Sequence, residues 1–140
     1  MTTTSKYIKP YNIENRIELW EKEFSRHIHI DESIKTITIF KNVGVFMEFK
    51  TLEENYKDYI INVEGTVHIE SDMFFANNIN WGYINGMFYT FINTNNLETL
   101  SFPKEVRGDF FVNCTSVNDN ITLENIKNYI KERCKTEYVY

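Results

Sequence analysis

Four of the five glycines in this 140-residue chain recur at a nearly constant interval, which constrains the fold more than any other feature. They are separated by 21, 21 and 22 residues and are Gly44, Gly65, Gly86 and Gly108. The last three share a context, with an apolar residue two positions before and two positions after the glycine. Gly44 matches this context less well, and Gly82 lies outside the register. Self-similarity at such a period is typical of stacked structural repeats.

One repeat resembles a known unit. Residues 96–110 read NLETLSFPKEVRGDF. This is similar to the N-x-L-x-x-L and P-x-x-V-x-G-x-F unit of degenerate leucine-rich-repeat-like proteins of phages and bacteria. The similarity is good over about residues 95–115, weaker over 60–94, and fails at Gly44, which lacks both the leucine pair and the proline. The resemblance implies stacked short parallel strands and a binding role, and it implies no catalytic residues.

Two segments flanking the repeats have the apolar periodicity of helices. The first predicts a helix over residues 12–29 and the second a helix over 122–136. Their apolar stripes are Ile13, Ile17, Trp20, Phe24 and Ile28, and Leu123, Ile126, Ile130 and Cys134. Residues 1–11 are expected to be flexible and residues 34–118 to form the repeat or strand region. The predicted fold is a single α+β domain, a short irregular β-solenoid of ~21-residue period capped by the two helices. A meander with glycine at its bends is the alternative.

Alternation along the predicted strands separates two faces. Residues two before, two after and four after each glycine are mostly apolar and are expected to face the core. The opposite face is expected to carry a column formed by Met47, His68, Tyr89 and Phe111, flanked by Phe49 and Phe91. An exposed aromatic column is typical of a partner surface, whereas a terminal helix packed on it would hide it.

Residues 71–103 contain no lysine or arginine and only two acidic residues. The same stretch is rich in aromatic side chains, which suits protein recognition. Its candidate anchors, if exposed, are Phe74, Phe75, Trp81 and Tyr83.

Composition and charge exclude several classes of function. The net charge is −5, and neither half of the chain is basic, so a nucleic-acid partner is not expected. No apolar run is long enough to cross a membrane, and the N-terminal residues lack the apolar core of a secretory signal. Seventeen isoleucines, seventeen asparagines and a single alanine indicate an AT-rich genome, as in many bacteriophages. The expected location is therefore the cytoplasm of a host cell.

Residues that could carry chemistry do not form a recognisable motif. His27 and His29 could supply two metal ligands, but no further ligand pattern completes a site. Cys114 could act as a nucleophile with His68 as base, although free cysteines are usually buried apolar groups. The sequence predicts no catalytic residues, no metal and no cofactor.

The expected function is that of a non-enzymatic protein-binding module, a small phage accessory protein that binds and modulates a host or phage protein. A host defence factor is one such target. The first alternative is an enzyme of unrecognised type that uses His68 and Cys114 in a cleft. The second is a self-associating structural protein that forms homo-oligomers.

Overall fold

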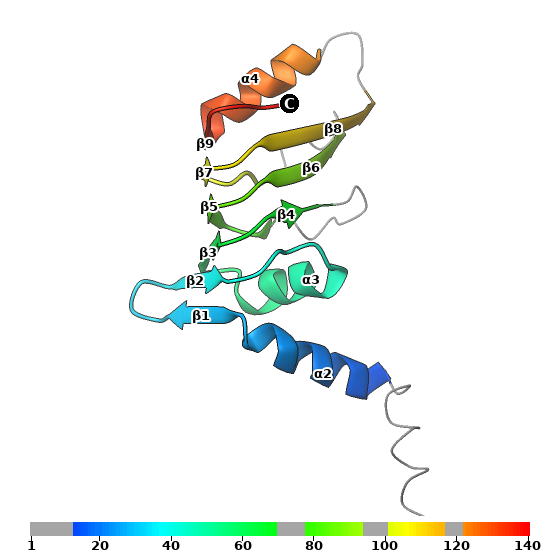
Figure 1. The fold of residues 1–140 in the computed structure, drawn as a ribbon, viewed down its shortest axis with the longest axis vertical. Helices are drawn as coiled ribbons and strands as arrows, with labels where there is room; N and C mark the ends of the chain where they lie inside the picture. The colour runs from blue at the N-terminus through cyan, green and yellow to red at the C-terminus, as the bar shows by residue number, and fades with distance from the viewer. Residues whose placement is uncertain (1–12, 70–77, 94–100, 117–121) are drawn as a thin grey trace, which may run out of the picture.

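The computed structural model describes residues 13–69, 78–93, 101–116 and 122–140, which form an α+β fold with two sheets (Figure 1). The predicted flexible segment 1–11 lies outside these residues. The helices are α2 (Ile13–Ser25), α3 (Phe46–Asn55) and α4 (Leu123–Arg133). The strands are β1 (Ile28–Asp31), β2 (Thr36–Ile39), β3 (Ile60–Val63), β4 (Val67–His68), β5 (Trp81–Ile84), β6 (Phe88–Asn93), β7 (Glu105–Val106), β8 (Phe110–Ser116) and β9 (Lys135–Thr136).

In both sheets most neighbouring strands are parallel, and the order of the strands in space is their order along the chain. The first has the order β1-β2-β3-β5-β7-β9 and the second β4-β6-β8. Only the β1–β2 pair is antiparallel among these strands. In the second sheet Val67 pairs with Phe88 and Phe88 with Phe110. The predicted equivalence of these three positions is therefore confirmed, and an antiparallel meander is excluded for these strands.

Glycine is needed where the chain bends from the first sheet to the second. The Gly86 amide donates to the Gly65 carbonyl at 2.9 Å, and the Gly108 amide donates to the Gly86 carbonyl at 3.0 Å. A Cβ at Gly108 would lie 2.5 Å from the carbonyl oxygen of Gly86. No glycine in the described chain has a positive φ. Close approach of successive bends, rather than an unusual backbone conformation, therefore explains the glycine period.

Gly82 falls outside that period because it lies at an irregularity between β3 and β5, where the register shifts. The Asn62 side chain occupies the space beside Gly82, and its Oδ1 accepts a hydrogen bond from the Tyr83 amide at 2.9 Å.

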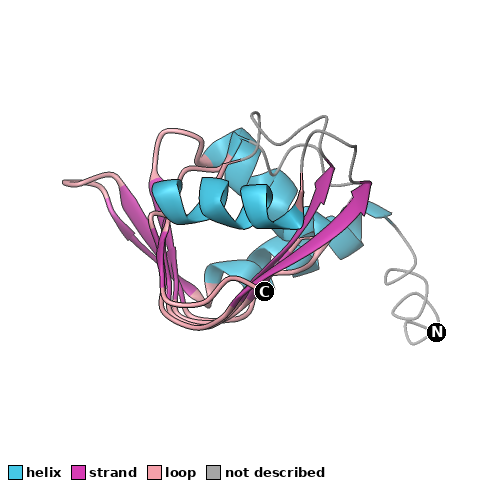
Figure 2. Ribbon diagram, turned by 90° about the horizontal axis from the view of Figure 1, so that it is seen from above, coloured by secondary structure: helices cyan, strands magenta, loops and turns pink. Residues whose placement is uncertain are grey.

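The core lies between the two sheets, on the side where the helices pack. Seen along the long axis, the strands form two groups with helices packed between them, and α2 extends past one group towards the N-terminus (Figure 2). The inward side chains of the second sheet, Val67, Phe88 and Phe110, are buried with Phe49 and Leu52 of α3 and with Ile126 and Ile130 of α4. The inward assignment of the positions two before and two after Gly65, Gly86 and Gly108 is confirmed.

The terminal helices are shorter than predicted. Helix α2 ends at Ser25, not at residue 29, because Ile28 pairs with Ile39 across the β1–β2 hairpin and so belongs to a strand. Helix α4 covers Leu123–Arg133, with Thr122 Oγ1 accepting from the Asn125 amide at its start. None of the helices in the described part of the chain is long and apolar enough to cross a membrane.

Helix α3 corrects the prediction for the first repeat. The expected inward residue Phe46 is half-exposed, and Phe49, assigned to the outer face, is fully buried. Glu48 explains the difference, since its Oε1 accepts from the Gly44 and Val45 amides at 3.0 and 2.9 Å and satisfies the helix start. Phe49 and Leu52 then share one helical face that packs into the core.

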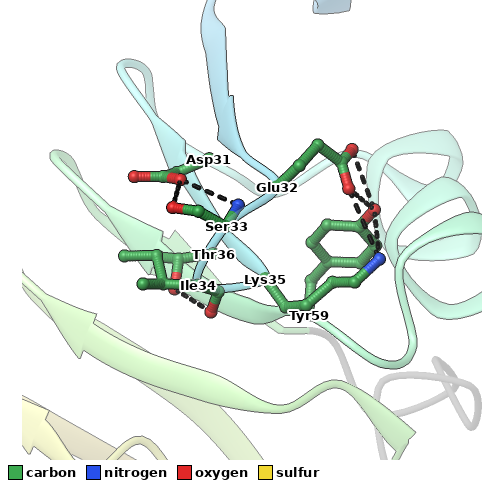
Figure 3. A network of polar contacts seen from close by, with 7 residues as sticks. All are labelled: Asp31, Glu32, Ser33, Ile34, Lys35, Thr36 and Tyr59. Atoms are coloured by element: carbon green, nitrogen blue, oxygen red, sulfur yellow. Dashed lines mark hydrogen bonds and ion pairs between the residues drawn. The ribbon is translucent and has the colours of Figure 1, made fainter.

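The β1–β2 hairpin is closed by polar contacts (Figure 3). Asp31 Oδ1 accepts from the Ser33 amide and hydroxyl at 3.1 and 2.6 Å, which lowers the pKa of Asp31. Tyr59 donates its hydroxyl to Glu32 at 2.7 Å and Lys35 pairs with Glu32 at 3.4 Å, and both contacts lower the pKa of Glu32. The turn is thereby tied to the loop that follows α3.

Candidate functional site

The candidate site is the outer face of the second sheet, opposite the core and the helices. Four side chains from successive strands stack there, one per strand. They are His68 of β4, Tyr89 of β6, Phe111 of β8 and Tyr140 of the C-terminal segment. This set is called the aromatic ladder, and each of its positions a rung. Parallel pairing sets the rungs, because His68 pairs with Tyr89, Tyr89 with Phe111, and Phe110 bridges to Val139.

Ring contact is continuous along the ladder. The ring centroids are 4.4 Å apart for His68 and Tyr89, 6.2 Å for Tyr89 and Phe111, and 5.3 Å for Phe111 and Tyr140. The first two pairs are tilted, with interplanar angles of 43° and 35°, whereas Phe111 and Tyr140 are stacked at 26°.

A second row of outward side chains runs beside the ladder. Met87 is 41% exposed and Tyr138 is 53% exposed. The half-buried Asp109 lies between them, and the half-buried Thr66 lies on the other side of Met87. Among the side chains of these two rows of described residues, only that of Asp109 carries a carboxylate or ammonium group. Asn113 lies at the far side and donates its Nδ2 to the Tyr89 hydroxyl at 3.2 Å. The face is therefore aromatic, almost uncharged and open.

The predicted site residues are only partly brought together. His68, Tyr89 and Phe111 form the expected column, and Phe91 contacts Tyr89 with ring centroids 6.4 Å apart. Met47 was wrong as a column member, because it lies in α3 and Gly44 occupies its rung.

The anchors predicted within the charge-poor stretch 71–103 are not found on this outer face in the described part of the chain. Trp81 is 1% exposed and packs edge-on against Phe49 and Phe88 in the core, so it presents no surface. Tyr83 is half-buried in the first sheet, where its hydroxyl donates to Glu64 at 2.5 Å and Arg107 lies over its ring. The hydrogen bond to Glu64 raises the pKa of Tyr83. Phe74 and Phe75 fall outside the described residues.

Sequence reasoning missed Tyr138 and Tyr140. The glycine period gives no signal there, since Val139 follows its partner Phe110 by 29 residues rather than 21 or 22. The alternation Tyr138-Val139-Tyr140 does match Asp109-Phe110-Phe111, with the apolar residue inward and its neighbours outward. That local pattern was the available clue.

The structure does not bring together the described residues that were considered for catalysis or metal binding. His68 stacks on Tyr89 on the open face, and the side chain of Cys114 is outside the described set. His27 contacts Glu23 at 3.3 Å, while His29 is exposed on β1. Within the described ranges no group of three or more histidine, cysteine, aspartate or glutamate side chains could hold a metal ion.

Comparison with known proteins adds no assignment. No protein-family model, curated protein or solved structure matches the chain. The candidate site therefore depends on the geometry alone.

Proposed function

We propose that this chain is a non-enzymatic protein-binding module whose docking surface is the aromatic ladder with Phe91, Met87 and Tyr138. The observation that carries the proposal is a four-rung aromatic face on the side of the sheet away from α3 and α4, whose apolar side chains pack in the core. Contiguous aromatic surface and few charges are features of interface centres. Tyrosine and phenylalanine also bury much apolar area while losing little side-chain freedom.

The scaffold is inferred to be a short β-solenoid of the leucine-rich-repeat-like type. Parallel pairing at steps of 21 and 22 residues in β4-β6-β8 supports this inference, as does the stack of Gly65, Gly86 and Gly108 at the bends. Helices α2 and α4 are inferred to serve as its caps, since they lie at opposite ends of the long axis (Figure 1).

The biological setting belongs to the same proposal. The AT-rich composition and the phage-type repeat unit support a small phage accessory protein acting in the cytoplasm of the host cell. Its partner would be a host or phage protein whose activity it modulates, for example a defence factor. An acidic chain of net charge −5 with an uncharged docking face suits a protein partner better than nucleic acid.

The test compares capture by three forms of the tagged protein. The first is the wild type, the second carries Tyr89→Ala and Phe111→Ala, and the third carries Ile34→Ala and Phe40→Ala. Ile34 and Phe40 are 63% and 57% exposed and lie outside the second sheet, so they are the matched control. Any protein captured by the wild type is purified and its affinity for each form is measured by calorimetry.

The proposal expects at least a ~30-fold loss of affinity in the ladder variant, corresponding to ~2 kcal/mol for hot-spot residues. The control should change affinity less than ~3-fold. Because Tyr89 and Phe111 are half-buried, a Tyr138→Ser, Tyr140→Ser variant at exposed positions separates lost binding from lost folding. Equal affinity in all forms would refute the assignment. Concentration-dependent mass of the wild type with no second protein bound would replace it by self-association.

A further inference from the structure

In the described part of the chain, no side chain fills the position next to His68 at the end of the aromatic ladder. Val43 bridges to Val67, which places Gly44 opposite His68 as the next position after the four aromatic rungs. Gly44 is exposed, and a Cβ built there would make only ordinary contacts, 3.7 Å from the Cβ and the carbonyl oxygen of His68. The His68 ring makes a tilted contact with Tyr89, and among the described residues, apart from the two chain neighbours of Gly44, only the Cβ and carbonyl oxygen of His68 lie within 4 Å of a Cβ built at Gly44. This end of the ladder therefore has room for one more ring.

The charges around Gly44 select the chemistry of that ring. Lys41 Nζ lies 2.5 Å from Glu48 Oε2, and Glu48 Oε1 accepts from the Gly44 amide. The ammonium group and the carboxylate neutralise each other, so neither offers a free charge to a ligand at this position. A neutral aromatic side chain fits the site, and it would add one stacked pair to the existing column.

The size of the face favours a short segment of a partner over a second copy of the chain. With rungs ~4.8 Å apart and ~3.3 Å per residue along each strand, the outward face covers about 250 Å². A stable interface needs ~800 Å² on each partner. The ladder therefore suits one segment of a partner polypeptide that carries its own aromatic anchor.

We propose that the Gly44 position is a notch that takes an aromatic side chain of the partner, stacked on His68 as a fifth rung. This inference rests on the proposed protein-binding function and names the recognition element of the same surface. It assigns His68 the role of ring partner at the open end of the ladder. The absence of a side chain at Gly44 then leaves the space for the ligand.

The first experiment uses N-acetyl-tryptophanamide as the probe, with N-acetyl-leucinamide as the matched aliphatic control. Amide chemical shifts of ¹⁵N-labelled protein are followed by NMR. The expected result is a saturable shift at Gly44 and His68 that is roughly 3- to 10-fold weaker with the leucine compound. The shift should disappear in Gly44→Phe, which fills the notch with its own ring, and persist in Gly44→Ala. Shifts centred on Tyr140, or equal shifts in Gly44→Phe, overturn the inference.

The second experiment measures the captured partner against Gly44→Phe and Gly44→Ala. Loss of affinity in Gly44→Phe alone supports the notch. Undiminished binding to Gly44→Phe overturns the notch but leaves the docking face standing, provided that the Tyr89→Ala, Phe111→Ala variant still loses the partner. If that variant also binds normally, the proposed function fails first. Thermal unfolding of each variant shows whether the fold is retained.

Discussion

Replacing Gly108 by alanine tests the explanation of the glycine period. The added Cβ would lie 2.5 Å from the Gly86 carbonyl oxygen and 2.7 Å from its carbonyl carbon, where ordinary contact begins at 3.4 Å. Relief requires the two bends to separate by nearly 1 Å, because both obstructing atoms belong to the backbone. That movement also weakens the 3.0 Å hydrogen bond from the Gly108 amide to Gly86.

The expected cost is about 2–4 kcal/mol, from ~1–3 kcal/mol of overpacking and ~1 kcal/mol for the hydrogen bond. At roughly 3–4 °C per kcal/mol for a chain of this size, Tm should fall by about 6–16 °C. Urea unfolding monitored by circular dichroism gives the free energy directly.

Gly44→Ala is the matched control, because it adds the same methyl group at a glycine of the same period. Its Cβ has ordinary contacts, and its φ is not in the left-handed region. The change should therefore be neutral or should stabilise by ~0.4–1 kcal/mol through the unfolded chain. If Gly108→Ala is no more destabilising than Gly44→Ala, close approach is not the reason for the glycine spacing.

Two further predictions concern buried polar groups. Glu48→Ala should destabilise by about 2–4 kcal/mol in urea unfolding, since it leaves the Gly44 and Val45 amides without their acceptor and Lys41 without its ion pair. A loss below ~1 kcal/mol would show that water replaces the carboxylate. Burial raises the pKa of Cys134 from 9.0 to about 12, so the native thiol should resist alkylation at pH 8. The unfolded chain ionises first, and stability should therefore fall as pH rises from ~9 towards ~12, with a smaller fall in Cys134→Ala, where only other groups such as Tyr83 contribute.

Part of the fold could be predicted because close contacts leave a strong mark on sequence. Successive bends touch through Gly65, Gly86 and Gly108, and only glycine fits there. The inward side chains Phe88 and Phe110 repeat at the same step, since each strand of β4-β6-β8 pairs in parallel with the one a period before. Both constraints act at one fixed interval, so the spacing of glycines and apolar residues in the sequence is enough to predict them.

The first repeat was mispredicted because a local interaction overrides the period. Gly44 is on the interval, yet Glu48 binds the amides beside it and starts a helix. Phe49 and Leu52 then reach the core at helical spacing, which alternation along a strand cannot anticipate. A local interaction also explains the error at Ile28. Its spacing fits the predicted helix, but it pairs with Ile39 and belongs to strand β1.

The candidate site could likewise be predicted only where its residues follow the glycine period. His68, Tyr89 and Phe111 could be predicted from the period, whereas Tyr140 reaches the ladder after the excursion through α4. Trp81 shows the reverse error, since an aromatic-rich, charge-poor stretch gives no indication of which rings are buried. Its place in the core against Phe49 and Phe88 depends on a helix that the period did not predict.

The order of the strands also determines how the molecule responds to force. In both sheets spatial order follows chain order, and α2 and the C-terminal residue lie at opposite ends of the long axis (Figure 1). Tension applied between these ends loads the hydrogen bonds of one strand at a time, because each strand is held mainly by its immediate neighbours. Under a pulling force the chain should come apart by unzipping from an end, and each released repeat of 21 or 22 residues would add roughly 70 Å of extended chain.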